Sequence, residues 1–323
     1  MSNVGIAGVG AYVPSLAVTN DDISELVETN DEWIVKRTGI RERRISEGED
    51  TSDMAVKASK LALERADLNP KDLDLIIVAT ITPDMFMPSV ACLVQGKIDA
   101  DNAACFDINV ACSGFVYAIE IAQSMMKSMN YKNALVIGSE TLSKVMNWKD
   151  RSTCVLFGDG AGAVVLKRTE EAGIIKSYLK SEGKKGDALT IGAADINTPF
   201  SKEIINKYRY ISMNGGEVLR FAVSAIADSI KEVLKETGIS MDDIKYIVPH
   251  QANVRIIQSA AKILHVDLEK FYINIDKYGN TSSASVPIAL NEIYENGMIK
   301  KGDKLILVAF GGGLTYASTV IEW

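Results

Sequence analysis

The sequence predicts an α/β fold made of two duplicated halves packed in layers. Short apolar runs typical of buried strands alternate with amphipathic segments typical of helices, and this alternation occurs twice along the chain. The chain has 323 residues, of which 47% are hydrophobic, and this suits about two domains' worth of buried core. We expect an N-terminal half over residues 1–170 and a C-terminal half over residues 171–323.

The first half contains the clearest strand and helix patterns. Apolar runs predict strands at residues 75–79, 105–109, 134–138 and 163–166. Amphipathic segments between them predict helices around residues 53–66 and 114–129. Strands separated by helices are typical of an α/β sheet, so we expect these strands to share one sheet.

The second half repeats this pattern. It predicts strands at residues 246–248, 271–275, 305–309 and 318–321, and helices at 217–236 and 285–296. A shift of about 169 residues superposes Thr80 on Pro249, Cys112 on Thr281 and Ile137 on Ile306, which indicates a duplicated fold. The segment 167–215, rich in Lys, Gly and Ser, is the expected junction together with an insertion.

The overall charge excludes several classes of partner. The net charge is −7 and the pI is about 5.1, whereas general nucleic-acid binders and proteins of anionic membranes carry a basic surface. We find no basic flank followed by an apolar leader and no apolar run of about 18 residues, so we expect a cytoplasmic protein. The four cysteines lack metal-ligand spacing, which favours a reduced, metal-free chain.

Cys112 is the candidate nucleophile. It follows an apolar strand and precedes the helical pattern at 114–129, so its sulfur is expected at a helix N-terminus, where free N–H groups and the helix dipole favour a thiolate. Cys92, Cys105 and Cys154 lie within apolar strand or helix patterns instead. The alternative interpretation of Cys112 is a buried core cysteine.

His250 and Asn280 are the expected polar partners of this cysteine. His250 follows the strand at 246–248 and is flanked by polar residues, which a plain core would avoid, although a structural histidine is the alternative. Asn280 lies in a Gly-Asn-Thr-Ser segment of the same half. A Cys nucleophile with a separate His and Asn is a route to covalent acyl chemistry, and a cleft between the halves is the natural place for it.

The glycines at 311–313 suit close approach of the backbone to a ligand. They follow the strand at 305–309 but lack the Lys-Ser/Thr pair of a phosphate-binding loop. We expect the N–H groups of Gly313 and Cys112 to form an oxyanion hole.

Together these segments resemble a known family, the β-ketoacyl-[acyl-carrier-protein] synthase III enzymes of bacterial type II fatty-acid synthesis. The resemblance runs in order from residue 4 to residue 323. It is carried by the segments Thr29–Ile40, Val110–Phe115, Phe157–Gly162, Pro249–Asn253, Tyr278–Ser282 and Ala309–Gly313.

The resemblance implies the thiolase fold, a homodimer, and a reaction that needs no cofactor. Cys112 would take the acyl group of an acyl-coenzyme A primer, most simply acetyl-coenzyme A, and malonyl-acyl carrier protein would then condense with it after losing CO2. His250 and Asn280 would stabilise the enolate oxygen. By the same resemblance, elongating ketosynthases of this fold have a Cys-His-His set instead. An Asn at position 280 therefore favours the initiating enzyme.

The resemblance also implies binding residues. Trp33 and Arg37 would sandwich the adenine of coenzyme A, and the other implied coenzyme A contacts are Thr29, Arg151, Gly215 and Asn253. Carrier-protein contacts would be Arg220, Arg255 and Lys262. The chain departs from the family at Gly216, Ile263 and Met87, the last of which replaces the Phe that the family commonly contributes across the dimer to the acyl pocket.

Two other functions remain open at this point. A related condensing enzyme or acyltransferase of secondary metabolism would carry the same three residues. A non-catalytic ketosynthase partner would have lost the nucleophile, whereas Cys112, His250 and Asn280 are all retained. A thiolase would need a second, C-terminal cysteine, and no cysteine follows Cys154.

Overall fold

The computed structural model describes residues 3–171, 173–201 and 209–323. Its first sheet consists, in spatial order, of β1 (Asn3–Tyr12), β7 (Gly160–Thr169), β6 (Asn133–Glu140), β4 (Leu75–Ala79) and β5 (Ala104–Ile108). β4 pairs in parallel with β5 and β6, and β7 runs antiparallel to β6 and β1. The four strands predicted in the first half are therefore confirmed, and they share one sheet.

The second sheet repeats this topology. It consists of β8 (Ile174–Ser181), β13 (Thr315–Glu322), β12 (Lys304–Gly311) and β11 (Ile244–Pro249). β11 is parallel to β12, β12 is antiparallel to β13, and β13 is antiparallel to β8, as in the first sheet from β4 to β1. The duplicated α/β fold is confirmed. The segment expected as a junction contributes β8, so part of it belongs to this sheet.

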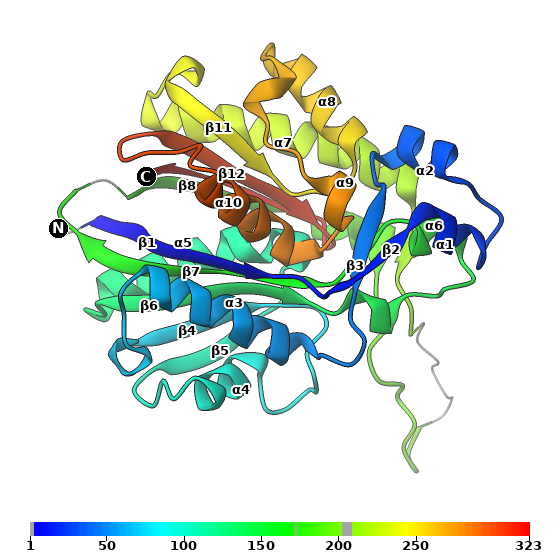
Figure 1. Ribbon diagram of the computed structural model, residues 1–323, viewed down its shortest axis with the longest axis horizontal. Helices are drawn as coiled ribbons and strands as arrows, with labels where there is room; N and C mark the ends of the chain where they lie inside the picture. Colours follow the sequence, from blue (N-terminus) through cyan, green and yellow to red (C-terminus); the bar gives the residue numbers. More distant parts are fainter. Residues whose placement is uncertain (1–2, 172, 202–208) are drawn as a thin grey trace.

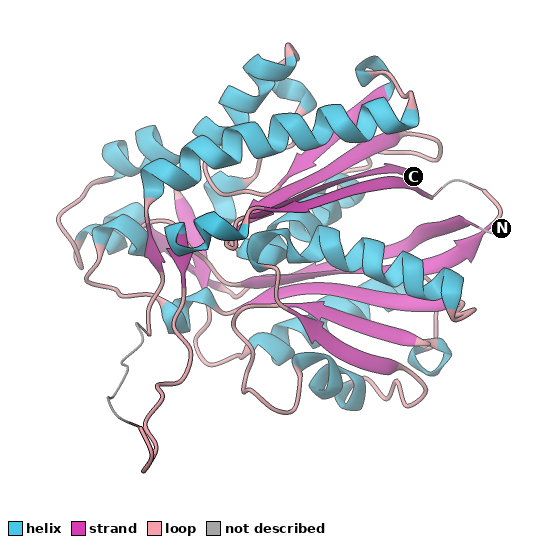
Figure 2. Cartoon of the chain, turned by 180° about the vertical axis from the view of Figure 1, so that it is seen from behind, coloured by secondary structure: helices cyan, strands magenta, loops and turns pink. Residues whose placement is uncertain are grey.

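Helices fill three layers around the two sheets (Figures 1 and 2). α5 (Gly114–Ser128) and α10 (Ser285–Glu295) lie between the sheets, and their apolar side chains pack with both. The outer face of the first sheet is covered by α3 (Thr51–Arg65) and α4 (Val90–Lys97), and that of the second by α7 (Gly215–Thr237) and α8 (Val254–Leu264). The order of layers is therefore αβαβα.

Burial on both faces explains why the central strands are continuous apolar runs. Along β4, Leu75 and Ile77 face the middle layer, whereas Ile76 and Val78 face the outer one. β12 alternates in the same way, with Leu307 toward the middle layer and Val308 toward α7 and α8.

The remaining elements are short and lie outside the two sheets. They are β2 (Leu16–Thr19), β3 (Glu42–Ile45), β9 (Leu189–Thr190), β10 (Ser212–Met213), α1 (Asn20–Ser24), α2 (Asp31–Thr38), α6 (Arg151–Cys154) and α9 (Ile275–Tyr278). In the part of the chain that the structure describes, no helix has the length and apolar character needed to cross a membrane.

The strand predicted at 271–275 is wrong. Only Phe271 contacts the sheet, through an isolated bridge to Ile247, and the chain then continues into α9. The Asn274 N–H is instead satisfied by the side chain of Gln251, at 3.2 Å. Because a side chain supplies the acceptor that a neighbouring strand would offer, the apolar run can be buried without forming a strand.

Candidate active site

Two similar turns meet at the centre of the molecule. The cysteine turn (Ala111–Ser113) is a 3-10 turn that precedes α5, and the serine turn (Ser282–Ala284) is a 3-10 turn that precedes α10. The first residue of each has a positive φ, 46° at Ala111 and 50° at Ser282. Cys112 is therefore matched in position by Ser283, two residues beyond the Thr281 to which the sequence shift assigned it.

Each turn packs against a central strand of the other half, at a glycine. A Cβ on Gly311 of β12 would lie 2.6 Å from the backbone nitrogen of Cys112. A Cβ on Gly138 of β6 would lie 2.4 Å from the carbonyl oxygen of Ser283. Only glycine leaves room for such backbone contacts, so these two positions allow the halves to interlock at the site.

Cys112 lies at this contact and is 6% exposed. Burial raises the pKa of its thiol to about 12, and the negative charge of Glu140 acts in the same direction. Burial therefore opposes the thiolate expected from the helix N-terminus, because loss of water outweighs the hydrogen bonds from the Ser282 side chain and the backbone N–H that favour ionisation.

His250 follows β11 and is 1% exposed. Its Nδ1 lies 2.7 Å from the Oγ of Ser285, and that same Oγ accepts a hydrogen bond from the Gln251 N–H at 3.3 Å. The hydroxyl proton can point at Nδ1, and in that tautomer the ring carries its own proton on Nε2. Burial lowers the pKa of His250 to about 3, so the ring is neutral.

The Nε2 atom of His250 is the group that can reach a ligand. It is buried and has no hydrogen-bond partner among the residues that the structure describes. Asn280 offers a second donor, since its Oδ1 accepts the Ser282 N–H at 2.9 Å and its Nδ2 carries the two donor hydrogens of the amide. The backbone of Asn280 is held to Leu156 and Gly158 by hydrogen bonds of 2.8 and 3.0 Å.

Two cavities adjoin at Cys112. The narrower has a volume of about 130 Å³ and is lined by Cys112, His250 and Asn280 together with apolar side chains. The wider, of about 980 Å³, is lined by Cys112, Ser282 and Gly313 among others. The three residues singled out in the sequence therefore share one cavity, although they come from different halves. Within the three described ranges, no group of three or more His, Cys, Asp or Glu side chains is arranged to hold a metal ion.

Comparisons with known proteins agree with this geometry. The family models for 3-oxoacyl-[acyl-carrier-protein] synthase III and for its C-terminal part match residues 106–183 and 234–323. The chain is 70% identical to a β-ketoacyl-[acyl-carrier-protein] synthase III of Clostridium beijerinckii and 55% identical to that of Clostridium novyi, and in both cases the match covers 100% of both chains. The crystal structure of 3-oxoacyl-[acyl-carrier-protein] synthase III from Aquifex aeolicus has 45% identity and a TM-score of 0.93, covering 99% of this chain and 100% of that one.

The chain belongs to the 3-oxoacyl-[acyl-carrier-protein] synthase III family. It is an acyltransferase with the thiolase-like fold. Relatives of such high identity over the full length decide for the synthase and against the alternative enzyme of secondary metabolism.

Two of the coenzyme A residues expected from the synthase resemblance line the narrow cavity. Gly215 and Asn253, at the starts of α7 and α8, line it. On α2, the ring of Trp33 has the guanidinium of Arg151 at 4.8 Å and that of Arg37 at 5.8 Å from its centre. Arg151 is thus the closer stacking partner, whereas the sequence paired Trp33 with Arg37.

Two of these residues have polar groups whose partners bear on ligand binding. Asn253 caps α8 by accepting the Arg255 N–H at 2.9 Å, and it donates to the carbonyl of Arg37 at 3.0 Å. Its amide therefore links α8 to α2, and one Nδ2 hydrogen is left for a ligand. The Oγ1 of Thr29 is buried and has no partner within the described ranges.

The expected carrier-protein contacts lie on two adjacent helices. Arg220 is on α7, Arg255 and Lys262 are on α8, and all three are exposed. Gly216 and Ile263, two positions that depart from the synthase pattern, are exposed on the same helices. Val218 and Ile256 of the same two helices line the narrow cavity.

The expected acyl-pocket residue is at the surface of its own chain. Met87 is 85% exposed, and the neighbouring Phe86 is 84% exposed. The lining of the wider cavity includes Met85 and Phe86 but not Met87.

Sequence reasoning missed Ser285 and Glu140. Ser285 shows no sequence signal beyond its place at a helix start, but Glu140 does. An acidic residue ends the apolar run of β6, and a charge at the end of a buried strand requires a partner or a function.

Proposed function

We propose that the chain catalyses the decarboxylative condensation of an acyl-coenzyme A primer with malonyl-acyl carrier protein, which yields a 3-oxoacyl-acyl carrier protein and begins fatty-acid synthesis. The observation that carries the proposal is the single cavity shared by Cys112, His250 and Asn280. One nucleophile beside two neutral hydrogen-bond donors suits acyl transfer followed by enolate stabilisation.

In the first step, the sulfur of Cys112 attacks the thioester carbonyl of the primer. The carbonyl oxygen becomes an oxyanion, and the N–H groups of Cys112 and Gly313 are the proposed donors to it. The bond to coenzyme A then breaks, and the thiol proton leaves with coenzyme A. The enzyme is left as an S-acyl-Cys112 thioester.

In the second step, a malonyl thioester loses CO2 and becomes an enolate. Nε2–H of His250 and Nδ2–H of Asn280 donate to the enolate oxygen, and its carbon attacks the acyl-Cys112 carbonyl. The new C–C bond forms, and Cys112 leaves as a thiolate that regains a proton. The low pKa of His250, about 3, supports a role as a neutral donor rather than as a base.

Trp33 with Arg151 and Arg37 is the proposed binding place for adenine, at the outer end of the narrow cavity, with Thr29, Gly215 and Asn253 as further contacts. The acidic carrier protein would dock on Arg220, Arg255 and Lys262, since a local basic surface is needed on a chain of charge −7. The enzyme is proposed to be a cytoplasmic homodimer that needs no cofactor, with Met87 of one subunit contributing to the acyl pocket of the other.

Acyl-enzyme formation tests the proposal most directly. The protein is incubated with acetyl-, butyryl- and isobutyryl-coenzyme A, and its intact mass is measured. We expect one acyl group on the wild type and none on Cys112→Ala, while Cys92→Ala still gains one. Retention of an acyl group by Cys112→Ala would show that another residue is the nucleophile.

Carrier-protein docking has its own test. Arg255→Glu should raise the Michaelis constant for malonyl-acyl carrier protein and leave acylation by acetyl-coenzyme A nearly unchanged. Lys235 lies in the last turn of α7, at the other end of this helix from Arg220. Lys235→Glu is the matched charge reversal and should change neither the Michaelis constant nor the rate of acylation. Equal losses in both reactions for Arg255→Glu would indicate a folding defect or a coenzyme A contact instead.

A further inference from the structure

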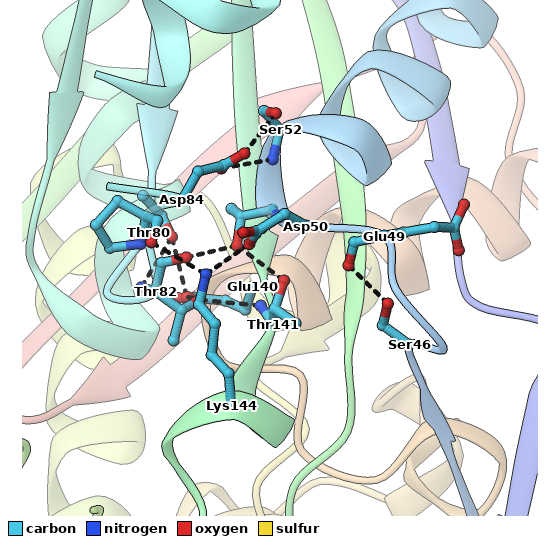
Figure 3. A network of polar contacts seen from close by, with 12 residues as sticks. Ser46, Glu49, Asp50, Ser52, Thr80, Thr82, Asp84, Glu140, Thr141 and Lys144 are labelled. Carbon is cyan, nitrogen blue, oxygen red and sulfur yellow. Dashed lines mark hydrogen bonds and ion pairs between the residues drawn. The ribbon is translucent and has the colours of Figure 1, made fainter. Parts of the chain in front are cut away.

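Glu140 is a buried carboxylate that the proposed reaction does not use. It is the last residue of β6 and is 0% exposed. Four neutral groups donate hydrogen bonds to it: the hydroxyls of Thr80, Thr82 and Ser282 and the N–H of Ile81. The Ser283 hydroxyl lies 3.0 Å from Oε1, but it also lies 2.8 Å from the carbonyl oxygen of Ala79, which can only accept its one hydrogen. Figure 3 shows Glu140 among Thr80, Thr82 and Thr141. These donors favour the ionised form of Glu140, which can only accept hydrogen bonds.

The two oxygens of Glu140 bind different halves of the molecule. Oε2 accepts hydrogen bonds from the loop that follows β4, including a 2.6 Å bond from the Thr82 hydroxyl. Oε1 accepts a bond of 3.0 Å from the Ser282 hydroxyl of the serine turn, and the Ser283 hydroxyl lies at the same distance. Glu140 therefore ties the serine turn of the C-terminal half to the N-terminal half.

This tie continues to Asn280. The Ser282 hydroxyl binds Glu140, and the Ser282 N–H binds Oδ1 of Asn280 at 2.9 Å. Ser282 also has a φ of 50°, which few residues other than glycine adopt without support. The carboxylate thus fixes the residue that in turn orients the Asn280 amide.

A buried carboxylate is a costly way to obtain only stability. Burial raises the pKa of Glu140, and the hydrogen bonds from Thr82, Ile81, Ser282 and Ser283 oppose that rise. Neutral hydroxyls would hold a turn with less desolvation. What a carboxylate adds is strong acceptance on two sides at once, so that both loops keep one geometry.

We propose that Glu140 is a positioning residue for the malonyl step, holding Ser282 so that the Asn280 amide points into the narrow cavity. The inference rests on the proposed function, which assigns Asn280 to the enolate oxygen. Acylation of Cys112 does not use Asn280, so it should proceed without Glu140.

A double-mutant cycle between Glu140 and Asn280 tests this. Glu140→Gln keeps the size of the side chain, but its NH2 group cannot accept hydrogen bonds on one of the two sides. We expect malonyl-acyl carrier protein decarboxylation to fall roughly 10- to 100-fold, while single-turnover acylation by acetyl-coenzyme A changes less than about threefold. In the Asn280→Ala background, the same change should cost little, since the amide it positions is gone.

Controls separate positioning from folding. Asp159 is a second carboxylate with 0% exposure, and it accepts bonds from Ser46 and Ser143. Asp159→Asn should lower the unfolding temperature without separating the two steps. Glu140→Asp, which keeps the charge, should restore part of the lost rate, and Ser282→Ala should reproduce the loss. Because acylation is measured in every variant, a misfolded protein is recognised by its failure to acylate.

Equal losses in both steps for Glu140→Gln, or losses that multiply with those of Asn280→Ala, would overturn the proposal. Failure of the proposed function would look different. In that case Asn280→Ala by itself would leave decarboxylation intact.

Discussion

The cysteine turn and the serine turn occupy corresponding places in the two halves, but they are held by different means. In the cysteine turn, Ser113 donates to the carbonyl of Val110 at 2.9 Å and lies 2.6 Å from the hydroxyl of Thr315. These partners are neutral. In the serine turn, Ser282 donates to the Glu140 carboxylate, and the Ser283 hydroxyl lies 3.0 Å from it.

The difference follows from what each turn presents to the cavity. Cys112 reacts through its own sulfur and backbone N–H, so the turn needs only a fixed backbone. A carboxylate bound to this turn would raise the thiol pKa further. Asn280 acts through a side-chain amide, whose direction depends on the hydrogen bond from Ser282. A charge is therefore used where the direction of an amide matters, whereas the cysteine turn itself is bound by neutral groups.

The largest expected effect comes from removing the amide of Asn280, which the serine turn holds. Asn280→Ala should slow malonyl decarboxylation by about 100- to 1,000-fold and leave acylation of Cys112 close to the wild-type rate, because the lost donor serves the enolate. Ser285→Ala, which keeps His250 but removes the partner of its Nδ1, should give a smaller loss in the same step. Single-turnover rates of both steps measure this, and a parallel fall in acylation would contradict the division between the turns.

Substitution of Gly311 or Gly138 should displace the cysteine turn or the serine turn separately. Gly311→Ala would press on the nitrogen of Cys112 and should slow acylation, whereas Gly138→Ala would press on Ser283 and should slow decarboxylation. Overpacking costs about 1–3 kcal/mol, so changes of about 5- to 150-fold are expected. Gly96→Ala, which meets no atom within 4 Å, is the control for a glycine substitution. If both variants slow the same step, the turns do not act separately.

The last comparison concerns ionisation at the cysteine turn and needs no substitution. Because burial raises the pKa of Cys112 to about 12, the thiolate fraction should rise about tenfold per pH unit between pH 7 and 10. The rate at which iodoacetamide alkylates Cys112 should rise by the same factor, and peptide mass mapping measures it. A plateau below pH 8 would show that the helix N-terminus ionises the thiol despite its burial.

Much of the fold can be read from the sequence, because strands buried on both faces leave long apolar runs. The runs at 75–79 and 305–309 are strands, and Cys112 lies at the start of a helix as expected. The run at 271–275 shows the limit of this reasoning. Its composition predicts burial, but whether buried backbone joins a sheet depends on which acceptors lie nearby, and here Gln251 supplies one.

The chemical types at the site can be predicted from the sequence, since Cys112, His250 and Asn280 each follow a recognisable strand or turn pattern. Their ionisation and orientation depend on contacts between distant parts of the chain, which form when it folds. The thiol is neutral because the packed halves exclude water from it. Glu140 and Ser282 are 142 residues apart in sequence and 3.0 Å apart in space, and no local pattern contains that distance.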